Sequence, residues 1–114
     1  MLSLYDIIEN LPAHVVYGSS NYQNIMVEDI IAGDLMSDIL VSCEAPYLLV
    51  TSLASSQTVR TADIVGAKAV LLVNDKLPAP EMKELAEKSD ITLLATPLPM
   101  YEACVSLSML KTFK

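Results

Sequence analysis

The chain has 114 residues, of which 53% are hydrophobic and only 5% are aromatic. This length predicts a single domain over residues 1–114, with a core built mostly from Leu, Ile, Val, Ala and Met. The formal net charge is −7, from 7 basic and 14 acidic residues. Because the basic residues are scattered along the chain and form no stripe, nucleic-acid binding is disfavoured.

Targeting and membrane signals are missing from the sequence. The N-terminus lacks the charged start and apolar core of a signal peptide, and the apolar stretches are far shorter than the roughly 20 residues that span a bilayer. We therefore expect a cytoplasmic protein without a membrane partner. Cys43 and Cys104 are interpreted as reduced core residues on apolar helix faces, with a redox or metal role as the alternative.

The first predicted elements are a short helix and a short strand. Ser3 and Asp6 resemble a capping box, apolar residues follow at helical spacing, and Pro12 ends a helix of about residues 3–10. Residues 14–17 then predict a brief strand.

The next segment, residues 24–32, carries β-favouring residues interrupted by Glu28 and Asp29 and is interpreted as a strand. Gly33 ends this strand. Asp34 is expected to be the N-cap of a following helix, with a ligand contact as the alternative role. That helix is expected to bury Leu35, Ile39, Leu40 and Cys43.

Residues 47–74 predict a compact βαβ unit with a strand at 47–52, a helix at 56–66 and a second strand at 69–73. The first strand is apolar without clean alternation, as is typical of a central strand buried on both faces. In the helix, small residues including Ala62 and Gly66 are expected to face the sheet.

The C-terminal part continues the alternation. Pro78 and Pro80 open a helix, residues 91–95 predict the last strand, and a closing helix follows from Met100. Strand and helix alternate four times after residue 25. The pattern predicts a three-layer α/β/α sandwich with a small, mainly parallel sheet.

A hydroxyl-rich loop enters the helix at 56–66, at the edge where open α/β sheets usually bind ligands. Unpaired N–H groups and the helix dipole favour an anion there, and Arg60 could add a charge-assisted contact. The alternative is that Ser55 and Ser56 only cap the helix and that Arg60 is a surface residue. The sequence contains neither a P-loop nor a G-x-G-x-x-G pattern.

Catalytic residues are not evident in the sequence. The single histidine, His14, is remote in sequence from both cysteines and from the serine loop. Glu28 with Asp29, or Asp34 with Asp38, could hold a divalent ion, but no further ligands stand at suitable spacing. We therefore expect no catalytic residue, no metal and no cofactor.

Nearly the whole chain resembles the DRTGG domain family. The resemblance is carried by IIAGDLMSDILV and by LLVTSLASSQTVRTADIVGAKAVLLVNDKLPAPEMKELAEKSDITLLATPLPMYEAC. The family is similar in fold to the N-terminal domain of HPr kinase/phosphorylase. It occurs as an accessory module in some phosphate acetyltransferases and in pyrophosphatases that carry CBS domains. It also occurs as stand-alone proteins of anaerobic bacteria and archaea, some of them associated with iron-only hydrogenase systems.

This sequence departs from the family at its two signature positions. The family has an Asp-Arg pair in the loop after the central strand and a Thr-Gly-Gly after the next strand, whereas this chain has residues 54–57 (ASSQ) and 73–75 (VND). Polar side chains nevertheless follow both strands. The candidate ligand-binding residues are Thr51, Ser52, Ser55, Ser56, Gln57, Arg60, Asn74 and Asp75.

The resemblance implies a regulatory or scaffolding module that lacks the kinase domain. We expect a non-enzymatic regulatory, ligand-sensing or scaffolding domain of a larger metabolic or redox system, with a nucleotide or phosphorylated metabolite as a candidate ligand. A homodimer is expected because small modules commonly cover spare apolar surface by self-association. The alternatives are a small enzyme that binds a phosphorylated metabolite at the same loops, and a pure scaffold without a small ligand.

Overall fold

The computed structural model describes residues 2–41 and 47–113, and Cys43 lies outside the described residues. The strands are β1 (Leu2–Ser3), β2 (His14–Tyr17), β3 (Met26–Val27), β4 (Asp29–Ala32), β5 (Tyr47–Thr51), β6 (Ala69–Leu72) and β7 (Thr92–Ala95). The helices are α1 (Leu4–Asn10), the 3₁₀ turn η1 (Tyr22–Asn24), α2 (Met36–Ile39), α3 (Ser56–Val65), α4 (Pro80–Ser89) and α5 (Met100–Phe113).

Five of the strands form one sheet in the order β2-β7-β6-β5-β4. Strands β4 to β7 run parallel, and β2 pairs antiparallel with β7. Strands β5, β6 and β7 are buried along their whole length, which is why their sequences are apolar without alternation. Strands β1 and β3 form a separate antiparallel pair.

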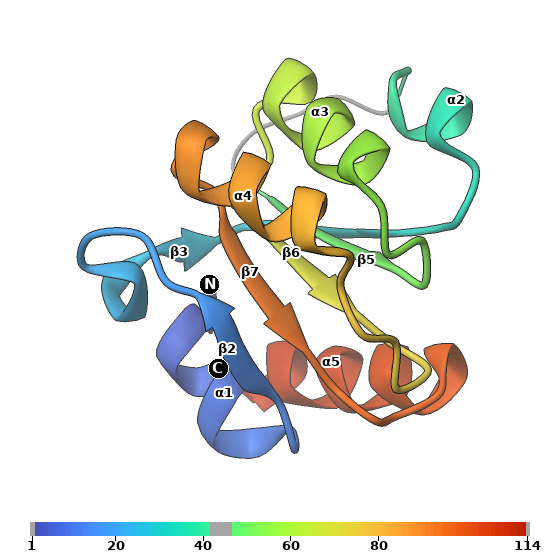
Figure 1. Ribbon diagram of the computed structural model, residues 1–114. Helices are drawn as coiled ribbons and strands as arrows, with labels where there is room; N and C mark the ends of the chain where they lie inside the picture. Colours follow the sequence, from blue (N-terminus) through green and yellow to red (C-terminus); the bar gives the residue numbers. More distant parts are fainter. Residues whose placement is uncertain (1, 42–46, 114) are drawn as a thin grey trace.

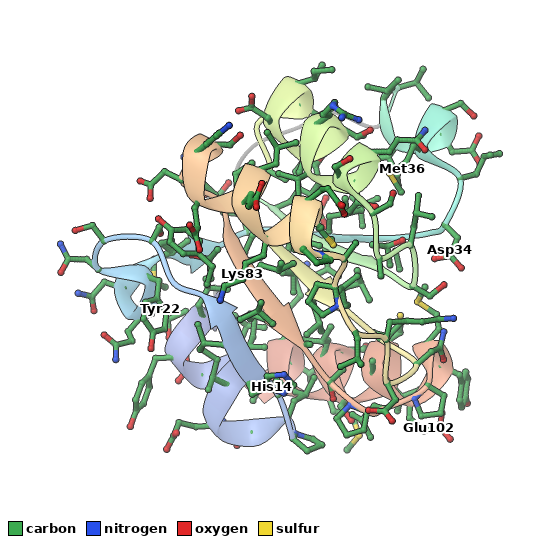
Figure 2. The ribbon with its side chains drawn as sticks, viewed as in Figure 1. His14, Tyr22, Asp34, Met36, Lys83 and Glu102 are labelled. Atoms are coloured by element: carbon green, nitrogen blue, oxygen red, sulfur yellow. The ribbon has the colours of Figure 1, made fainter. Side chains whose placement is uncertain are left out.

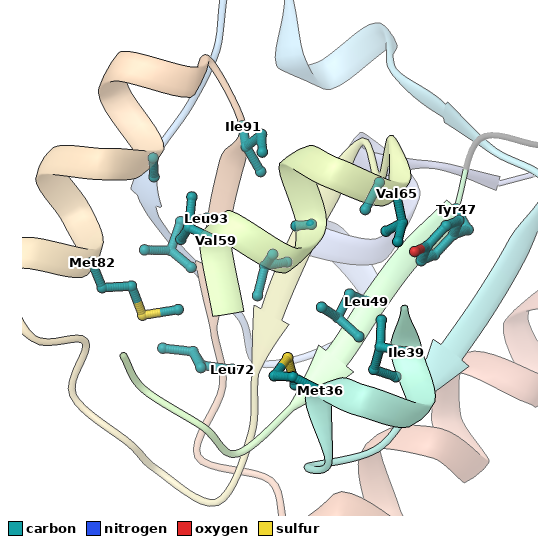
Figure 3. Close-up of a cluster of buried hydrophobic side chains, with 14 of the residues drawn as sticks. Met36, Ile39, Tyr47, Leu49, Val59, Val65, Leu72, Met82, Ile91 and Leu93 are labelled. Atoms are coloured by element: carbon teal, nitrogen blue, oxygen red, sulfur yellow. The ribbon is translucent and has the colours of Figure 1, made fainter. Parts of the chain in front are cut away.

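Helices cover both faces of this sheet, as Figure 1 shows. Helices α2, α3 and α4 lie over one face, and α1 and α5 lie over the other. The first face contributes Leu49 to a buried cluster with Val59 and Met82 (Figure 3). The second face contributes Leu48 to a cluster with Leu107. The predicted three-layer α/β/α sandwich with a mainly parallel sheet is confirmed.

Several predicted helix ends are confirmed by their caps. Ser3 Oγ accepts the N–H of Asp6 at 3.1 Å, and the Asp6 carboxylate accepts the N–H of Ser3 at 3.3 Å, so the capping box is present. Helix α4 begins at Pro80. Helix α3 ends at Gly66, which has φ +78°. Gly66 is exposed and serves as this C-cap, so the prediction that it faces the sheet was wrong.

Two predictions for residues 24–41 were also wrong. The strand predicted at 24–32 divides at Glu28, because β3 pairs with β1 whereas β4 joins the main sheet beside β5. The helix that follows has only four residues, and it buries Met36 and Ile39. Leu35 and Leu40, predicted to be buried, are exposed: Leu35 precedes the first helical turn and Leu40 follows the last.

Candidate functional site

The four parallel strands end at one edge of the sheet and bring their following loops together. Ala32 of β4 pairs with Val50 of β5, and Leu72 of β6 pairs with both Thr51 of β5 and Ala95 of β7. The loops after residues 32, 51, 72 and 95 therefore emerge side by side. All predicted ligand residues lie at this carboxyl edge or on the helix that follows it.

Asp34 forms the tightest polar cluster at this edge. One carboxylate oxygen, Oδ1, accepts the N–H of Ser52 at 2.7 Å and the hydroxyl of Thr51 at 2.9 Å, and Oδ2 accepts the hydroxyl of Ser52 at 2.7 Å. The backbone N–H of Ser52 is the main cause that lowers the pKa of Asp34 below its usual value, with smaller contributions from both hydroxyls and from Lys76. Asp34 is thus held as a carboxylate.

This arrangement corrects the predicted role of Asp34. The N-cap of α2 is Leu35, which makes no side-chain cap. Instead of capping the helix, Asp34 ties the loop after β4 to the end of β5, 17 to 18 residues further along the chain. Thr51 and Ser52, predicted as ligand residues, lie at the expected edge. Their hydroxyl groups donate hydrogen bonds to the carboxylate of Asp34.

The loops after β6 and β7 are tied together across the edge. The chain leaves β6 toward α4 and β7 toward α5, and these helices lie on opposite faces of the sheet (Figure 1). Such a divergence is where α/β sheets commonly open a ligand crevice. Here the N–H of Asn74 donates to the carbonyl of Leu98 at 2.8 Å, and the N–H of Asp75 donates to that of Thr96 at 3.2 Å.

Asn74 has a further structural role in the same loop. Its Oδ1 accepts the N–H of Met100 at 3.1 Å and so caps the first turn of α5. Asn74 and Asp75 both have positive φ, at 62° and 57°, a conformation that Asn and Asp tolerate better than most residues. The backbone conformation of this loop and the cap on α5 therefore account for Asn74 and Asp75, the two residues predicted here as ligand contacts.

The N-terminus of α3 differs from that of α5. Ser55 is its N-cap residue, and within the described residues no side chain caps the helix. Thr58 instead donates its N–H to the carbonyl of Ser55 at 3.1 Å and its hydroxyl to the carbonyl of Leu53 at 2.7 Å. Ser56 is half-buried and Gln57 is exposed. The N–H groups of Ser56 and Gln57 in this first turn are thus available to an acceptor from outside the helix.

Beside this turn, a groove of about 220 Å³ lies between α3 and α4. Ser56 and Arg60, both predicted, contribute to it from α3. Helix α4 contributes residues that the sequence assigned to no site. These residues are Glu81, Glu84, Leu85 and Lys88.

The remaining polar candidates lie elsewhere. His14 is exposed on β2, at the sheet edge opposite β4. Cys104 is half-buried on α5, and burial raises the pKa of its thiol. Among the described residues, no three His, Cys, Asp or Glu side chains are grouped as a metal site would require. Over the same residues, no helix has the length and apolar character needed to cross a bilayer.

No protein-family model and no curated protein matches the sequence. Among solved structures, the chain is similar to the CBS and DRTGG domains of the regulatory region of Clostridium perfringens pyrophosphatase, solved in complex with the activator diadenosine tetraphosphate. The TM-score is 0.75 at 16% sequence identity, and the match covers 95% of this chain and 46% of the other. This likeness concerns the fold, and it supports the DRTGG-like domain that the sequence resemblance predicted.

Proposed function

We propose that this chain is a non-catalytic regulatory domain that senses a phosphorylated small molecule, such as an adenine nucleotide, at the N-terminus of α3. The observation that carries the proposal is the open first turn of α3 beside the groove lined by Ser56 and Arg60. A helix N-terminus offers N–H donors and a partial positive charge to a phosphate. The guanidinium of Arg60 and the hydroxyl of Ser56 would add hydrogen bonds to its oxygens.

The neighbouring Asp34 cluster supports this assignment by shaping the loop that leads into α3. Because Asp34 binds Ser52 through both its N–H and its hydroxyl, the chain is fixed three residues before the N-cap Ser55. A phosphate at α3 would thus meet a preorganised loop. The carboxylate of Asp34 repels anions from the end of β5, and Glu81 and Glu84 repel them from the α4 wall of the groove. We therefore place the phosphate at the first turn of α3 itself, beside the cation Arg60.

The similar solved structure supports a regulatory rather than a catalytic role. That protein is the regulatory region of an enzyme and holds a nucleotide activator. This chain spans about half of that longer chain. We therefore propose that the domain regulates a larger metabolic or redox system. An iron-only hydrogenase system is one candidate, because some stand-alone members of the family that this chain resembles are associated with such systems.

Titration calorimetry with ADP and adenosine tests the proposed ligand class. ADP is expected to bind more tightly than adenosine, because only ADP carries the phosphates. The double substitution Ser56→Ala and Arg60→Ala is expected to weaken ADP binding about tenfold or more, since hydrogen bonds to charged groups contribute roughly 1.5–3 kcal/mol. The same loss should appear as a smaller thermal shift at a given ADP concentration.

Lys83→Ala is the matched control for charge, because Lys83 is an exposed cation of α4 that does not line the groove. This variant should bind ADP as the natural chain does. Equal binding of ADP and adenosine would contradict recognition through phosphate. Unchanged ADP binding by the double variant would move the ligand away from α3.

A further inference from the structure

A second cavity lies at the edge of the sheet where the parallel strands begin, opposite the N-terminus of α3. Its volume is about 340 Å³, which exceeds that of the groove beside Arg60. Helices α3 and α4 both end at this edge, because each runs from the carboxyl end of one strand back to the start of the next. The residues that line the cavity include Ser19, Ile25, Asp63, Lys68, Asp90 and Ile91.

Ser19 brings a buried hydrogen-bond donor to this cavity. Its side chain is only 7% exposed, and Thr92 behind it is fully buried. Thr92 Oγ1 accepts the N–H of Ser19 at 3.2 Å and lies 3.0 Å from Ser19 Oγ. The two hydroxyls share one hydrogen bond, so one of their two protons has no acceptor among the described residues. A donor without a partner costs least where a ligand can reach it, so Thr92 donates to Ser19, and the proton of Ser19 is left for the cavity.

Two carboxylates and one ammonium group surround the cavity without pairing with one another. Asp90 Oδ1 accepts the hydroxyl of Tyr17 at 2.7 Å, and its Oδ2 accepts no hydrogen bond within the described part of the chain. Over the same residues, the carboxylate of Asp63 accepts none, and Lys68 forms no ion pair with either carboxylate. All three charged groups are therefore available to a bound molecule.

The ends of α3 and α4 add negative charge to this cavity. The last carbonyl groups of a helix lack intrahelical partners and carry the negative end of its dipole. Together with Asp63 and Asp90 they outweigh Lys68, so the cavity attracts a ligand of net positive charge and repels phosphates. A bare metal ion is disfavoured as well, because Lys68 would repel it and the described residues offer no group of three metal ligands.

We propose that this cavity binds a free basic amino acid, such as lysine or ornithine. The ligand matches the site charge for charge, because its two ammonium groups face Asp63 and Asp90. Its carboxylate accepts hydrogen bonds from Lys68 and from the spare proton of Ser19. The volume of about 340 Å³ lies at the low end for small-molecule sites, which run from roughly 300 to 1,000 Å³, so an amino acid fits better than a nucleotide.

A ¹⁵N NMR titration of the full chain with L-lysine tests this site. Saturable chemical-shift changes are expected at the amides of Gly66, Lys68 and Asp90, with none at Ser56 on the other edge of the sheet. Two analogues separate the contacts: cadaverine lacks the carboxylate of lysine, and 6-aminohexanoate lacks its α-ammonium group. Each is expected to bind about fivefold more weakly or less, because each loses one set of charge-assisted hydrogen bonds.

Substitutions of two exposed residues assign the contacts. Lys68→Gln is expected to raise the dissociation constant of L-lysine about fivefold without weakening cadaverine, which has no carboxylate for Lys68 to bind. Asp63→Asn is expected to weaken both ligands about fivefold, because both present ammonium groups. Glu102→Gln is the matched control, since it removes an exposed carboxylate from α5 on the other face of the sheet and leaves both dissociation constants unchanged.

Ser19→Ala tests the buried donor and is expected to weaken L-lysine more than cadaverine. If circular dichroism shows that this variant has unfolded, Lys68→Gln decides the question. Equal affinity for L-lysine and cadaverine overturns the proposal, and so do shift changes that never saturate. Saturable binding of L-lysine that survives both Asp63→Asn and Lys68→Gln unchanged overturns it as well. ADP binding at the start of α3 is measured separately, because the two sites lie at opposite edges of the sheet.

Discussion

At the residue scale, the carboxylate of Asp34 determines how the loop after β4 meets the end of β5. It accepts three hydrogen bonds from Thr51 and Ser52, one of them from a backbone N–H. The capping box of Ser3 and Asp6 could be predicted because both partners lie in one turn. The partners of Asp34 lie 17 and 18 residues away, so only the folded sheet reveals them.

Asp34→Asn is expected to lower the free energy of unfolding by about 1 kcal/mol at pH 7, because hydrogen bonds to a charged carboxylate become weaker bonds to a neutral amide. The loss is no larger because Asp34 is exposed and solvent weakens its interactions. The folded state lowers the pKa of Asp34 below its unfolded value of about 3.9. The carboxylate therefore stabilises the fold fully above that pH and less as the pH falls through the folded pKa. Urea denaturation at pH 7 and below pH 4 should show the difference between the two proteins shrink at low pH.

Asp63→Asn is the control, since Asp63 is an exposed carboxylate on α3 away from this cluster. It should change the free energy of unfolding by less than Asp34→Asn does. A difference between the natural chain and Asp34→Asn that persists undiminished at acid pH would contradict the role of the charged carboxylate.

At the element scale, helix ends follow local sequence where caps are local. The end of α3 could be predicted from Gly66, and the start of α4 from Pro80. The start of α5 at Met100 was predicted as well, but its cap was not, because Asn74 comes from the loop after β6. The break between β3 and β4 was not predicted either, because it depends on a partner far away in the sequence: β3 pairs with Leu2 and Ser3 of β1.

Gly66→Ala tests the helix end of α3. A Cβ at this position would meet nothing within 4 Å, so the cost comes from the backbone conformation at φ +78° alone. We expect a loss of about 1 kcal/mol in the free energy of unfolding. Gly33→Ala, whose added Cβ would lie in ordinary contact with Ile39 at 3.7 Å, should change stability much less. Equal effects of the two substitutions in urea denaturation would contradict this assignment.

At the scale of the whole molecule, the alternation of strands and helices predicted the layers but not the order of the strands. Strand β2 lies at the sheet edge and pairs antiparallel with β7, which follows it much later in the chain, as in the pairing of His14 with Ala95. The hydroxyl of Tyr17 donates to Asp90 at 2.7 Å and fixes β2 to the end of α4. Non-local pairs of this kind leave no periodic signal in the sequence.

In the candidate site, too, local patterns could be predicted from the sequence, whereas contacts between elements could not. The sequence identified the α3 side, because hydroxyl residues and an arginine at a helix start are a local pattern. It missed Lys88 and the carboxylates of α4, because the packing of α3 against α4 sets which of their side chains line the groove. These two helices lie side by side over one face of the sheet (Figure 2). The binding surface we propose is therefore a product of two helices packed on one face of the sheet.

The most direct test is a ¹⁵N NMR titration of the full chain with ADP. We expect saturable chemical-shift changes concentrated at the amides of Ser55, Ser56, Gln57 and Arg60, with weaker changes along the facing side of α4. The same titration with adenosine should shift these amides less. Saturable changes centred on the opposite end of the sheet, near Gly66, or no changes at all, would contradict a phosphate-sensing site at the start of α3.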